Sequence, residues 1–242
     1  MTTVLLIRHG RTAANASGVL VGRSSGVELD EIGQRQVAAA GQRLAAIPLV
    51  AVVTSPLRRC RQTAQAIQGA NQASPAVAVE RRLVECSYGD WTGRSMRELV
   101  KEPLWQSVQH QPSAVRFPGG ESMAEMSSRA VTAIRGWDER LAGELGDDVI
   151  WAAVSHGDLI KAVLADALGM HLDGFQRILV DPGALSAVRY AAGRSRVLTM
   201  NSIGADISGL LAARGAKPKR ARRGPQPGVP PGDGQGAADL AG

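Results

Sequence analysis

The sequence predicts an α/β fold of three layers, in which helices cover both faces of a mostly parallel central sheet. Two observations lead to this prediction. Short apolar runs such as TVLLI (3–7) alternate along the chain with longer segments whose apolar residues recur at helical spacing. Parallel strands need crossover connections of about a dozen residues or more, and the intervening helical segments are long enough to provide them.

The first strand and the first long helix are expected within the first 50 residues. TVLLI (3–7) is a short apolar run typical of a buried strand. The segment 29–47 has an acidic start, which favours a helix N-terminus. Its apolar residues at roughly helical spacing are Ile32, Val37, Leu44 and Ile47.

A second strand–helix–strand unit is expected to follow. VAVVTS (50–55) is a β-branched run that stops at Pro56. The segment 57–70 indicates a helix with Pro56 just inside its start and Gly69 near its end, the usual placement of these residue types. PAVAVE (75–80) predicts the third strand.

The second half of the domain begins with the longest predicted helix, 122–145. DVIWAAVSHG (148–157) repeats the opening pattern of an apolar strand followed by His and Gly, and 158–169 predicts the helix after it. Two late strands, 184–191 and 195–202, predict a hairpin. The apolar positions of the longest helix are Met126, Ala130, Ile134, Trp137, Leu141 and Leu145.

Composition separates a folded domain from a basic tail. Apolar residues make up 44% of the 242 residues, which indicates a globular chain, and the net charge is +6. From Arg214 onward six basic and two acidic residues give a balance of +4, which leaves +2 for residues 1–213. We therefore expect a domain over 1–211 and a disordered Pro/Gly-rich tail over 212–242. The tail could bind a polyanion weakly, although composition favours a solvated tail without a partner.

Other features bear on the surroundings of the protein. No apolar run approaches the roughly 18 residues of a membrane span, and no signal-peptide pattern precedes the first strand. The two cysteines, Cys60 and Cys86, form no disulfide framework and are expected to be small buried thiols. A cytoplasmic location is therefore expected. An edge strand or exposed helix could form a homodimer, which the sequence does not decide.

Polar residues follow three of the predicted strands. The three groups are Arg8 with His9, Ser55 with Arg58 and Arg59, and Ser155 with His156. Ligands of open α/β sheets bind outside the carboxyl ends of the strands, so these groups meet if the strands are neighbours. Converging arginines repel one another unless an anion lies between them, and a phosphoryl group matches the arginine fork.

These residues carry a resemblance to a known family. The blocks LLIRHGRTAAN, TSPLRRCRQTA, RLVECSYGDWTG, PGGES and VSHGD occur in that order between residues 5 and 158. Together they resemble the histidine phosphatase superfamily in its phosphoglycerate-mutase-like branch. RHG alone would be a weak signal, whereas five ordered blocks on predicted strand ends are specific. The resemblance implies a phosphoglycerate mutase-like fold.

The resemblance also implies roles for individual residues. His9 would be the nucleophile that becomes phosphohistidine, and Glu85 would donate and accept the proton. His156 would be the second histidine of the phosphate pocket, and the remaining phosphate contacts would be Arg8, Arg59 and Asn15. Arg58 occupies the variable position of the SPLxR pattern and is expected to face solvent. Neighbouring cations would lower the pKa of Glu85 and burial would raise it, and the sequence leaves the balance open.

Four further residues are candidates for substrate contacts, each with a structural alternative. Tyr88, like Trp91, could instead belong to the core or the pocket wall. Glu121 and Ser122 of PGGES could simply open the longest helix, where acidic and capping residues are favoured. Arg116 is the candidate contact for a second anionic group. His110 and His171 lie outside every block and are expected to be structural or exposed.

The predicted function is that of a metal-independent, acid-phosphatase-like phosphomonoester hydrolase acting through phosphohistidine on a small phosphorylated metabolite. No cofactor or metal is expected, because nucleotide-binding glycine loops are missing from the sequence and arginines beside the histidines oppose a cation. A phosphoglycerate mutase-type phosphomutase is the first alternative. Mutases of the family carry a longer insertion after the glutamate block, whereas 85–121 is short here. A non-catalytic phospho-ligand-binding or scaffold protein is the second alternative.

Overall fold

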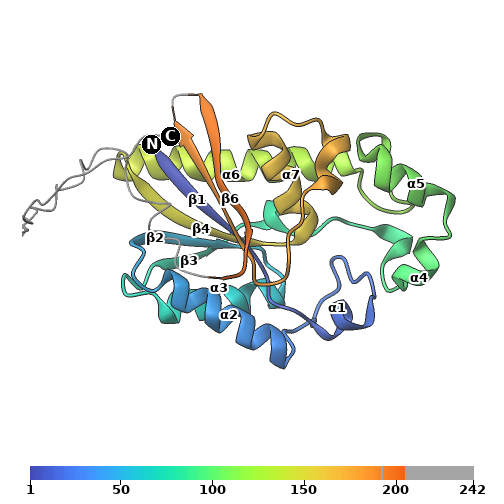
Figure 1. The fold of residues 1–242 in the computed structure, drawn as a ribbon, viewed down its shortest axis with the longest axis horizontal. Helices are drawn as coiled ribbons and strands as arrows, with labels where there is room; N and C mark the ends of the chain where they lie inside the picture. Colours follow the sequence, from blue (N-terminus) through green and yellow to red (C-terminus); the bar gives the residue numbers. More distant parts are fainter. Residues whose placement is uncertain (192, 205–242) are drawn as a thin grey trace, which may run out of the picture. The chain divides into compact units, whose positions relative to one another are not determined.

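The computed structural model describes residues 1–191 and 193–204, and within them the central sheet has six strands. Their order is β3–β2–β4–β1–β5–β6 (Figure 1). β1, β2, β3 and β4 run parallel to one another, whereas β5 is antiparallel to β1 and β6 is antiparallel to β5. The bounds are β1 Thr2–Arg8, β2 Leu49–Thr54, β3 Ala76–Val79, β4 Val149–Ser155, β5 Leu185–Ala191 and β6 Arg194–Ser202.

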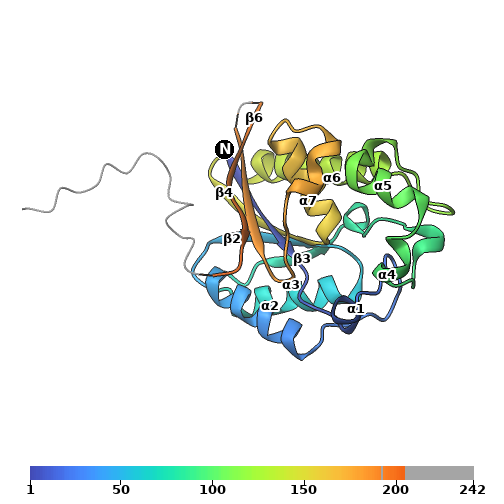
Figure 2. The ribbon, with the colours of Figure 1, turned by 45° about the vertical axis from the view of Figure 1, so that its right-hand side comes forward.

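Helices cover the two faces of this sheet, with α2 and α3 on one side and α6 and α7 on the other (Figures 1 and 2). The α-helices are α1 Ala13–Ser17, α2 Glu31–Leu44, α3 Arg58–Ala70, α4 Met96–Leu99, α5 Pro103–His110, α6 Met123–Leu145 and α7 Gly157–Ala167. Short 3-10 helices are η1 Arg81–Leu83, η2 Gly89–Trp91, η3 Pro112–Ala114 and η4 Leu172–Arg177. The predicted three-layer α/β/α fold with a mostly parallel sheet is confirmed.

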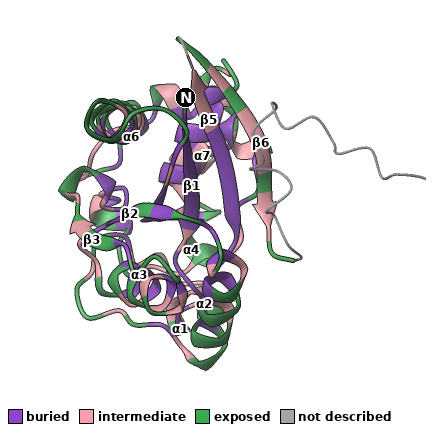
Figure 3. Ribbon diagram, turned by 90° about the vertical axis from the view of Figure 1, so that its left-hand side faces the viewer, coloured by how far each residue is buried: buried purple, intermediate pink, exposed green. Residues whose placement is uncertain are grey.

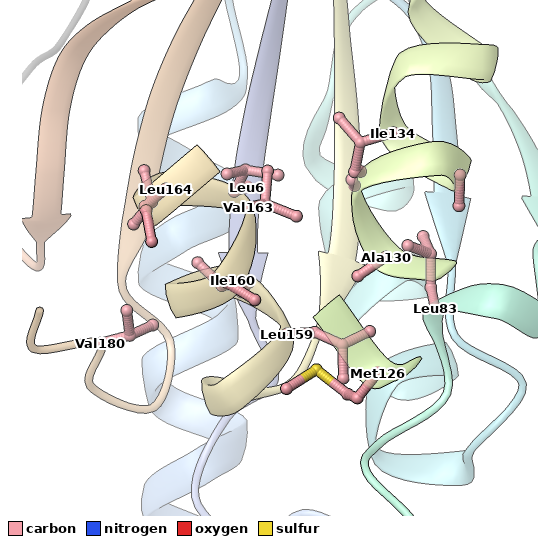
Figure 4. Close-up of a cluster of buried hydrophobic side chains, with 14 of the residues drawn as sticks. Leu6, Leu83, Met126, Ala130, Ile134, Leu159, Ile160, Val163, Leu164 and Val180 are labelled. Carbon is pink, nitrogen blue, oxygen red and sulfur yellow. The ribbon is translucent and has the colours of Figure 1, made fainter. Parts of the chain in front are cut away.

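Alternating side chains of β1 supply both halves of the core. Leu5 and Ile7 pack in the cluster with α2 and α3, and Val4 and Leu6 pack in the cluster with α6 and α7. Figure 4 shows Leu6 beside Val163 of α7. Burial on both faces explains why the strand is an unbroken apolar run. Figure 3 shows β1 almost entirely buried, whereas the edge strands β3 and β6 consist of exposed and half-buried residues.

Three details of the predicted helices are corrected by the structure. Pro56 precedes α3 instead of starting it, because Leu57 is the N-cap and keeps an extended backbone. Ile32 is exposed, and the buried face of α2 is formed by Val37, Ala40 and Leu44 together with Gly33 and Gly41. A Cβ on Gly33 would lie 2.0 Å from the Arg11 carbonyl oxygen. Leu145 is also exposed, since it is the last residue of α6.

Two predictions from the sequence concern residues after 204. The domain boundary after Leu211 and the basic tail 212–242 lie outside the described residues. Within 1–191 and 193–204, no helix combines the length and the apolar character that crossing a membrane would require.

Candidate active site

The ends of three parallel strands meet at one edge of the sheet. β4 lies between β1 and β2, with Arg8 opposite Ser155 in the register. The ladder continues one residue further, because the His9 N–H donates to the Ser155 carbonyl over 3.0 Å and the Ser55 N–H donates to the Val154 carbonyl over 2.9 Å. His9, Ser55 and His156 therefore emerge side by side, as the order of strands requires.

His9 is 3% exposed and presents one ring nitrogen to Arg59. Its Nδ1 lies 2.7 Å from the Gly10 carbonyl oxygen, and its Nε2 lies 3.2 Å from Arg59 Nε. A carbonyl only accepts and a guanidinium only donates, so these contacts require the proton on Nδ1 and a lone pair on Nε2. The structure thus holds His9 in the tautomer that makes Nε2 nucleophilic.

His156 is completely buried and lies with its ring centroid 5.2 Å from that of His9. Its Nδ1 is 3.2 Å from Arg59 Nη2, and its Nε2 is 2.8 Å from Ser55 Oγ. The Ser55 hydroxyl can donate or accept, so it satisfies either tautomer of the ring. His156 can therefore accept from Arg59 or turn an Nδ1–H toward an oxyanion without losing its partner.

Both imidazoles are held neutral by their surroundings. Burial lowers the pKa of His9 well below its usual value, and the charges of Arg59 and Arg8 lower it further. Burial, then the charge of Arg59, and then that of His9 lower the pKa of His156 in the same way. Since a protonated ring has no lone pair on Nε2, this electrostatic setting keeps His9 able to attack.

Two arginines have buried nitrogen atoms that meet no hydrogen-bond partner among the described residues. Arg8 donates through Nη1 to the Val180 carbonyl over 2.6 Å, but its Nε has no acceptor. Arg59 donates through Nη2 to the Gly22 carbonyl over 2.8 Å, but its Nη1 has none. A buried cationic N–H without an acceptor is costly, and the oxygens of an anion beside His9 would satisfy both.

Glu85 lies at the same place with a strongly perturbed carboxyl group. Its Oε2 is 3.9 Å from His156 Nδ1, and its Oε1 accepts from the Cys86 N–H over 2.8 Å. Burial and the charge of Asp158 raise the pKa of Glu85 to about 7. The hydrogen bond from the Cys86 N–H and the charges of Arg59 and Arg8 act in the opposite direction and lower this pKa. Burial therefore prevails over the neighbouring cations, which settles the balance that the sequence left open.

Asn15 is held at the cavity by the start of α1. Its Oδ1 accepts from the Thr12 N–H over 3.1 Å, and its backbone N–H donates to the Thr12 hydroxyl oxygen over 3.2 Å, so the two residues form a capping box. The amide oxygen is thereby engaged with Thr12, and Nδ2 is the group that can donate toward a ligand.

Asp158 was not singled out from the sequence, although it belongs to the VSHGD block. Its Oδ2 accepts from the Tyr88 hydroxyl over 2.8 Å, and its Oδ1 is 3.7 Å from Lys161 Nζ. Its position two residues after His156, in the first turn of α7, was the available signal. Asp158 matters here because its charge helps to raise the pKa of Glu85.

These side chains open into a cavity of about 320 Å³. Polar residues at its base are Arg8, His9, Asn15, Arg59, Glu85 and Asp158. Tyr88 and Trp91 belong to its wall, as the sequence reasoning allowed, whereas His156 does not line it. Within the described residues, no three His, Cys, Asp or Glu side chains are grouped to hold a metal ion.

Three of the predicted substrate contacts do not line the cavity. Arg116 is an exposed side chain paired with Glu125. Ser122 is the N-cap of α6 and forms a capping box with Glu125. Glu121 accepts from Arg23 over 2.7 Å and from Arg129 over 2.6 Å. Their side chains form ion pairs or cap a helix, and they do not line the cavity.

Glu121 and Arg129 contact the segment that carries Glu85. Glu121 Oε1 accepts from the Ser87 N–H over 2.8 Å. Arg129 donates to the carbonyl oxygens of Val84 over 2.7 Å and Glu85 over 3.1 Å. The pair therefore holds the backbone on both sides of the Glu85 carboxyl.

The remaining predicted positions are structural or exposed. Cys60 and Cys86 are buried, and burial raises the pKa of the Cys60 thiol to about 12. Arg58 faces solvent and pairs with Glu28. His110 is exposed, and the side chain of His171 is 74% exposed.

The fold and this geometry define a class: an α/β protein with an anion pocket of paired histidines and arginines at the carboxyl edge of its sheet. The chain matches the histidine phosphatase superfamily (branch 1) over residues 4–203. It therefore belongs to that superfamily.

The sequence is similar to proteins that have been given different functional names. Bifunctional protein Rv2228c of Mycobacterium tuberculosis is 34% identical over 84% of this chain, which spans 54%, about half, of that relative's length. Glucosyl-3-phosphoglycerate phosphatase of Mycolicibacterium vanbaalenii is 29% identical, covering 77% of this chain and 91% of the relative. Probable phosphoglycerate mutase GpmB of Yersinia enterocolitica is 32% identical, covering 78% of this chain and 86% of the relative.

A solved structure supports the fold. That of a mycobacterial glucosyl-3-phosphoglycerate phosphatase has a TM-score of 0.73 at 24% identity, covering 83% of this chain and 98% of that one. The arrangement of strands and helices is therefore shared, as the resemblance implied.

Proposed function

We propose that this protein is a phosphatase that hydrolyses monoesters of small phosphorylated metabolites through a phosphohistidine on His9. The observation that carries the proposal is the pair of buried guanidinium nitrogens Arg8 Nε and Arg59 Nη1, near the unprotonated Nε2 of His9. Neither nitrogen has an acceptor within the part of the chain that the structure describes. A phosphoryl group supplies the missing acceptors and an electrophilic phosphorus. Membership of the superfamily and a phosphatase among the curated relatives support the same reaction.

In the first step, His9 Nε2 attacks phosphorus and the bond from phosphorus to the ester oxygen breaks. The Nδ1–H bond to the Gly10 carbonyl stabilises the charge that the ring gains. Arg8 and Arg59 donate to the equatorial oxygens, where negative charge spreads in the transition state. Glu85 enters this step as a carboxylic acid and gives its proton to the departing alkoxide.

In the second step, water attacks the phosphohistidine. Glu85, now a carboxylate, takes a proton from that water as the bond from phosphorus to nitrogen breaks. His9 regains its lone pair, and inorganic phosphate leaves. Asn15 and His156 are proposed to contact the phosphoryl oxygens during both steps. The proposed steps use no metal or cofactor.

The phosphomutase alternative is favoured by one comparison, the likeness to a probable phosphoglycerate mutase. A mutase must hold the second anionic group of its substrate while phosphohistidine is shielded from water. Arg116, the candidate for that contact, lies outside the cavity lining and pairs with Glu125. Hydrolysis requires only that water reach the phosphohistidine. We therefore favour the phosphatase over the phosphomutase.

We expect phosphate release to exceed isomerisation when the protein is incubated with 3-phosphoglycerate and a trace of 2,3-bisphosphoglycerate. The measurement follows 2-phosphoglycerate and inorganic phosphate in the same samples. Isomerisation that outruns phosphate release by orders of magnitude would replace the phosphatase proposal by the mutase alternative. Binding of phosphate esters without either product would leave the scaffold alternative.

The pH dependence should follow the raised pKa of Glu85. The general acid is present below about pH 7 and is lost above it, since the pKa of Glu85 is about 7. His9 stays unprotonated into the acid range because its pKa is lowered. For alkyl phosphates, kcat/KM should therefore be highest on the acid side of pH 7 and fall above it. A profile that rises from pH 6 to pH 9 would contradict this assignment of Glu85.

A further inference from the structure

Apart from the groups around His9, most of the side chains that line the cavity are apolar. Trp91 and Trp105 stack with their ring centroids 6.2 Å apart at 26°, and Trp91 also meets the ring of Phe117 at 5.3 Å. These rings come from the segment between Glu85 and α6. The apolar lining residues are Val19, Leu20, Val21, Trp91, Met96, Trp105, Val108, Phe117, Leu179 and Val180.

Two large apolar side chains of this lining are exposed. Met96 at the start of α4 is 37% exposed, and Leu179, just after η4, is 65% exposed. They come from segments far apart in the sequence and line the same cavity. Leaving such side chains in water forgoes burial energy, which an apolar group bound in the cavity would recover.

The charges of the lining disfavour a second anion. Apart from Arg8 and Arg59, the described lining contains one cation, Lys161, and it is already engaged. Its Nζ donates to Gln176 Oε1 over 3.0 Å, lies 3.7 Å from Asp158 Oδ1 and sits 5.4 Å from the centroid of the Phe175 ring.

Carboxylates of the lining would in turn repel an acidic substrate group. Asp158 and Asp181 both line the cavity, and Asp181 Oδ2 accepts only an amide N–H, from Asn201 over 2.8 Å, among the contacts of the described residues. A carboxylate on the alcohol part of a substrate would face these like charges without an unengaged cation to balance it.

We infer that the cavity selects phosphomonoesters whose alcohol part is uncharged and has an apolar, flat face. This inference rests on the proposed phosphatase function and specifies its substrate class. The phosphoryl group binds between Arg8, Arg59 and His9. The alcohol part lies against Trp105, Met96 and Leu179, and the lining also contains the amide of Gln109, which can pair with a hydroxyl group.

The test compares three aryl phosphates of similar leaving-group acidity: phenyl, 2-naphthyl and 4-carboxyphenyl phosphate. We expect kcat/KM for 2-naphthyl phosphate to exceed that for 4-carboxyphenyl phosphate by about tenfold or more, because the naphthyl group gains apolar contact and the carboxylate meets like charge. Phenyl phosphate should lie between them. Equal or faster turnover of the carboxylated ester would overturn the inference.

Variants at the rim locate the alcohol part directly. Trp105→Ala should reduce the preference for 2-naphthyl over phenyl phosphate by about threefold to tenfold through lost ring contact. Leu179→Lys should lower KM for 4-carboxyphenyl phosphate and leave that for phenyl phosphate nearly constant, because it adds a cation at the rim. Leu145→Lys is the matched control, at an exposed leucine of α6 outside the cavity lining. It should change neither the preference for 2-naphthyl over phenyl phosphate nor the ratio of the KM values for 4-carboxyphenyl and phenyl phosphate.

The outcomes separate this inference from the function on which it rests. Failure to release phosphate from 4-nitrophenyl phosphate, or release that persists in His9→Ala, would refute the phosphatase proposal itself. Release that depends on His9, with ratios unchanged in both Trp105→Ala and Leu179→Lys, would refute only the substrate class. If the ratio for 4-carboxyphenyl and phenyl phosphate shifts as much in Leu145→Lys as in Leu179→Lys, the cause is a general charge effect. That result would also refute the substrate class.

Discussion

Replacing His9 by alanine is expected to lower phosphate release by about 10⁴-fold or more, the scale seen when a catalytic nucleophile is removed. Alanine has no lone pair to attack phosphorus, so no covalent intermediate can form. The same variant should lose the acid-labile label that the unaltered protein acquires from a substrate carrying radioactive phosphate. Phosphate release and the label are measured on the same preparations.

His110→Ala is the control for this variant, because His110 is exposed and lies outside the cavity lining. A melting curve checks that His9→Ala remains folded. Label that survives in His9→Ala, or that maps to His156 in the unaltered protein, would assign the nucleophile elsewhere. Activity lost in a chelator and restored by a divalent ion would contradict the metal-independent steps.

Replacing Glu85 by glutamine is expected to lower kcat/KM for alkyl phosphates by about 10²–10⁴-fold, the usual contribution of a general acid. The effect on 4-nitrophenyl phosphate should be much smaller for the first step, because nitrophenolate leaves without needing a proton. Glutamine preserves the shape of the side chain but cannot donate the carboxylic proton. The measurement is the ratio of the two kcat/KM values across pH 5–9.

The shape of the pH profile separates a proton donor from a residue that only shapes the pocket. In Glu85→Gln, the fall of kcat/KM above pH 7 for alkyl phosphates should disappear together with the titrating carboxyl. Glu31→Gln, at an exposed position in the first turn of α2, should retain the profile. Equal losses on both substrates with an unchanged profile would deny Glu85 the role of proton donor.

The active site keeps a histidine and a glutamate uncharged in the same pH range. Burial and nearby arginines favour a neutral His9, while burial and Asp158 favour a neutral Glu85 near pH 7. The nucleophile is therefore unprotonated and the proton donor protonated in the same range, on the acid side of about pH 7. Arg8 and Arg59 remain charged and supply the attraction for the phosphoryl group.

Much of this protein was predictable from local sequence. Buried parallel strands are covered on both faces, so the apolar runs in 3–7 and 149–154 were recognisable as strands. Because parallel strands end at one edge, the polar residues that follow them were expected to meet, and the structure places His9, Ser55 and His156 together. Ser122, a capping residue type, was expected near the start of the longest helix, and the structure makes it the N-cap of α6.

Other features depended on residues distant in the sequence. Ile32 looked like a core residue, yet α2 packs through Gly33 and Gly41, whose missing side chains allow close backbone contact. Glu121 looked available to a substrate, but it accepts from Arg23 and Arg129. Hydropathy patterns report which residues are apolar, and they do not report which surface of a neighbouring helix or which ion partner will meet them.

The balance of charge and burial at Glu85 belongs to the tertiary structure alone. A pKa depends on the distances to several charges and on the exclusion of water, and segments from four parts of the chain set both around this carboxyl. The apolar wall arises in the same way, since Leu20, Trp105 and Leu179 meet only after folding. The residue types of the phosphate pocket were thus readable from local motifs, whereas their protonation states and the shape of the cavity required the complete three-dimensional packing.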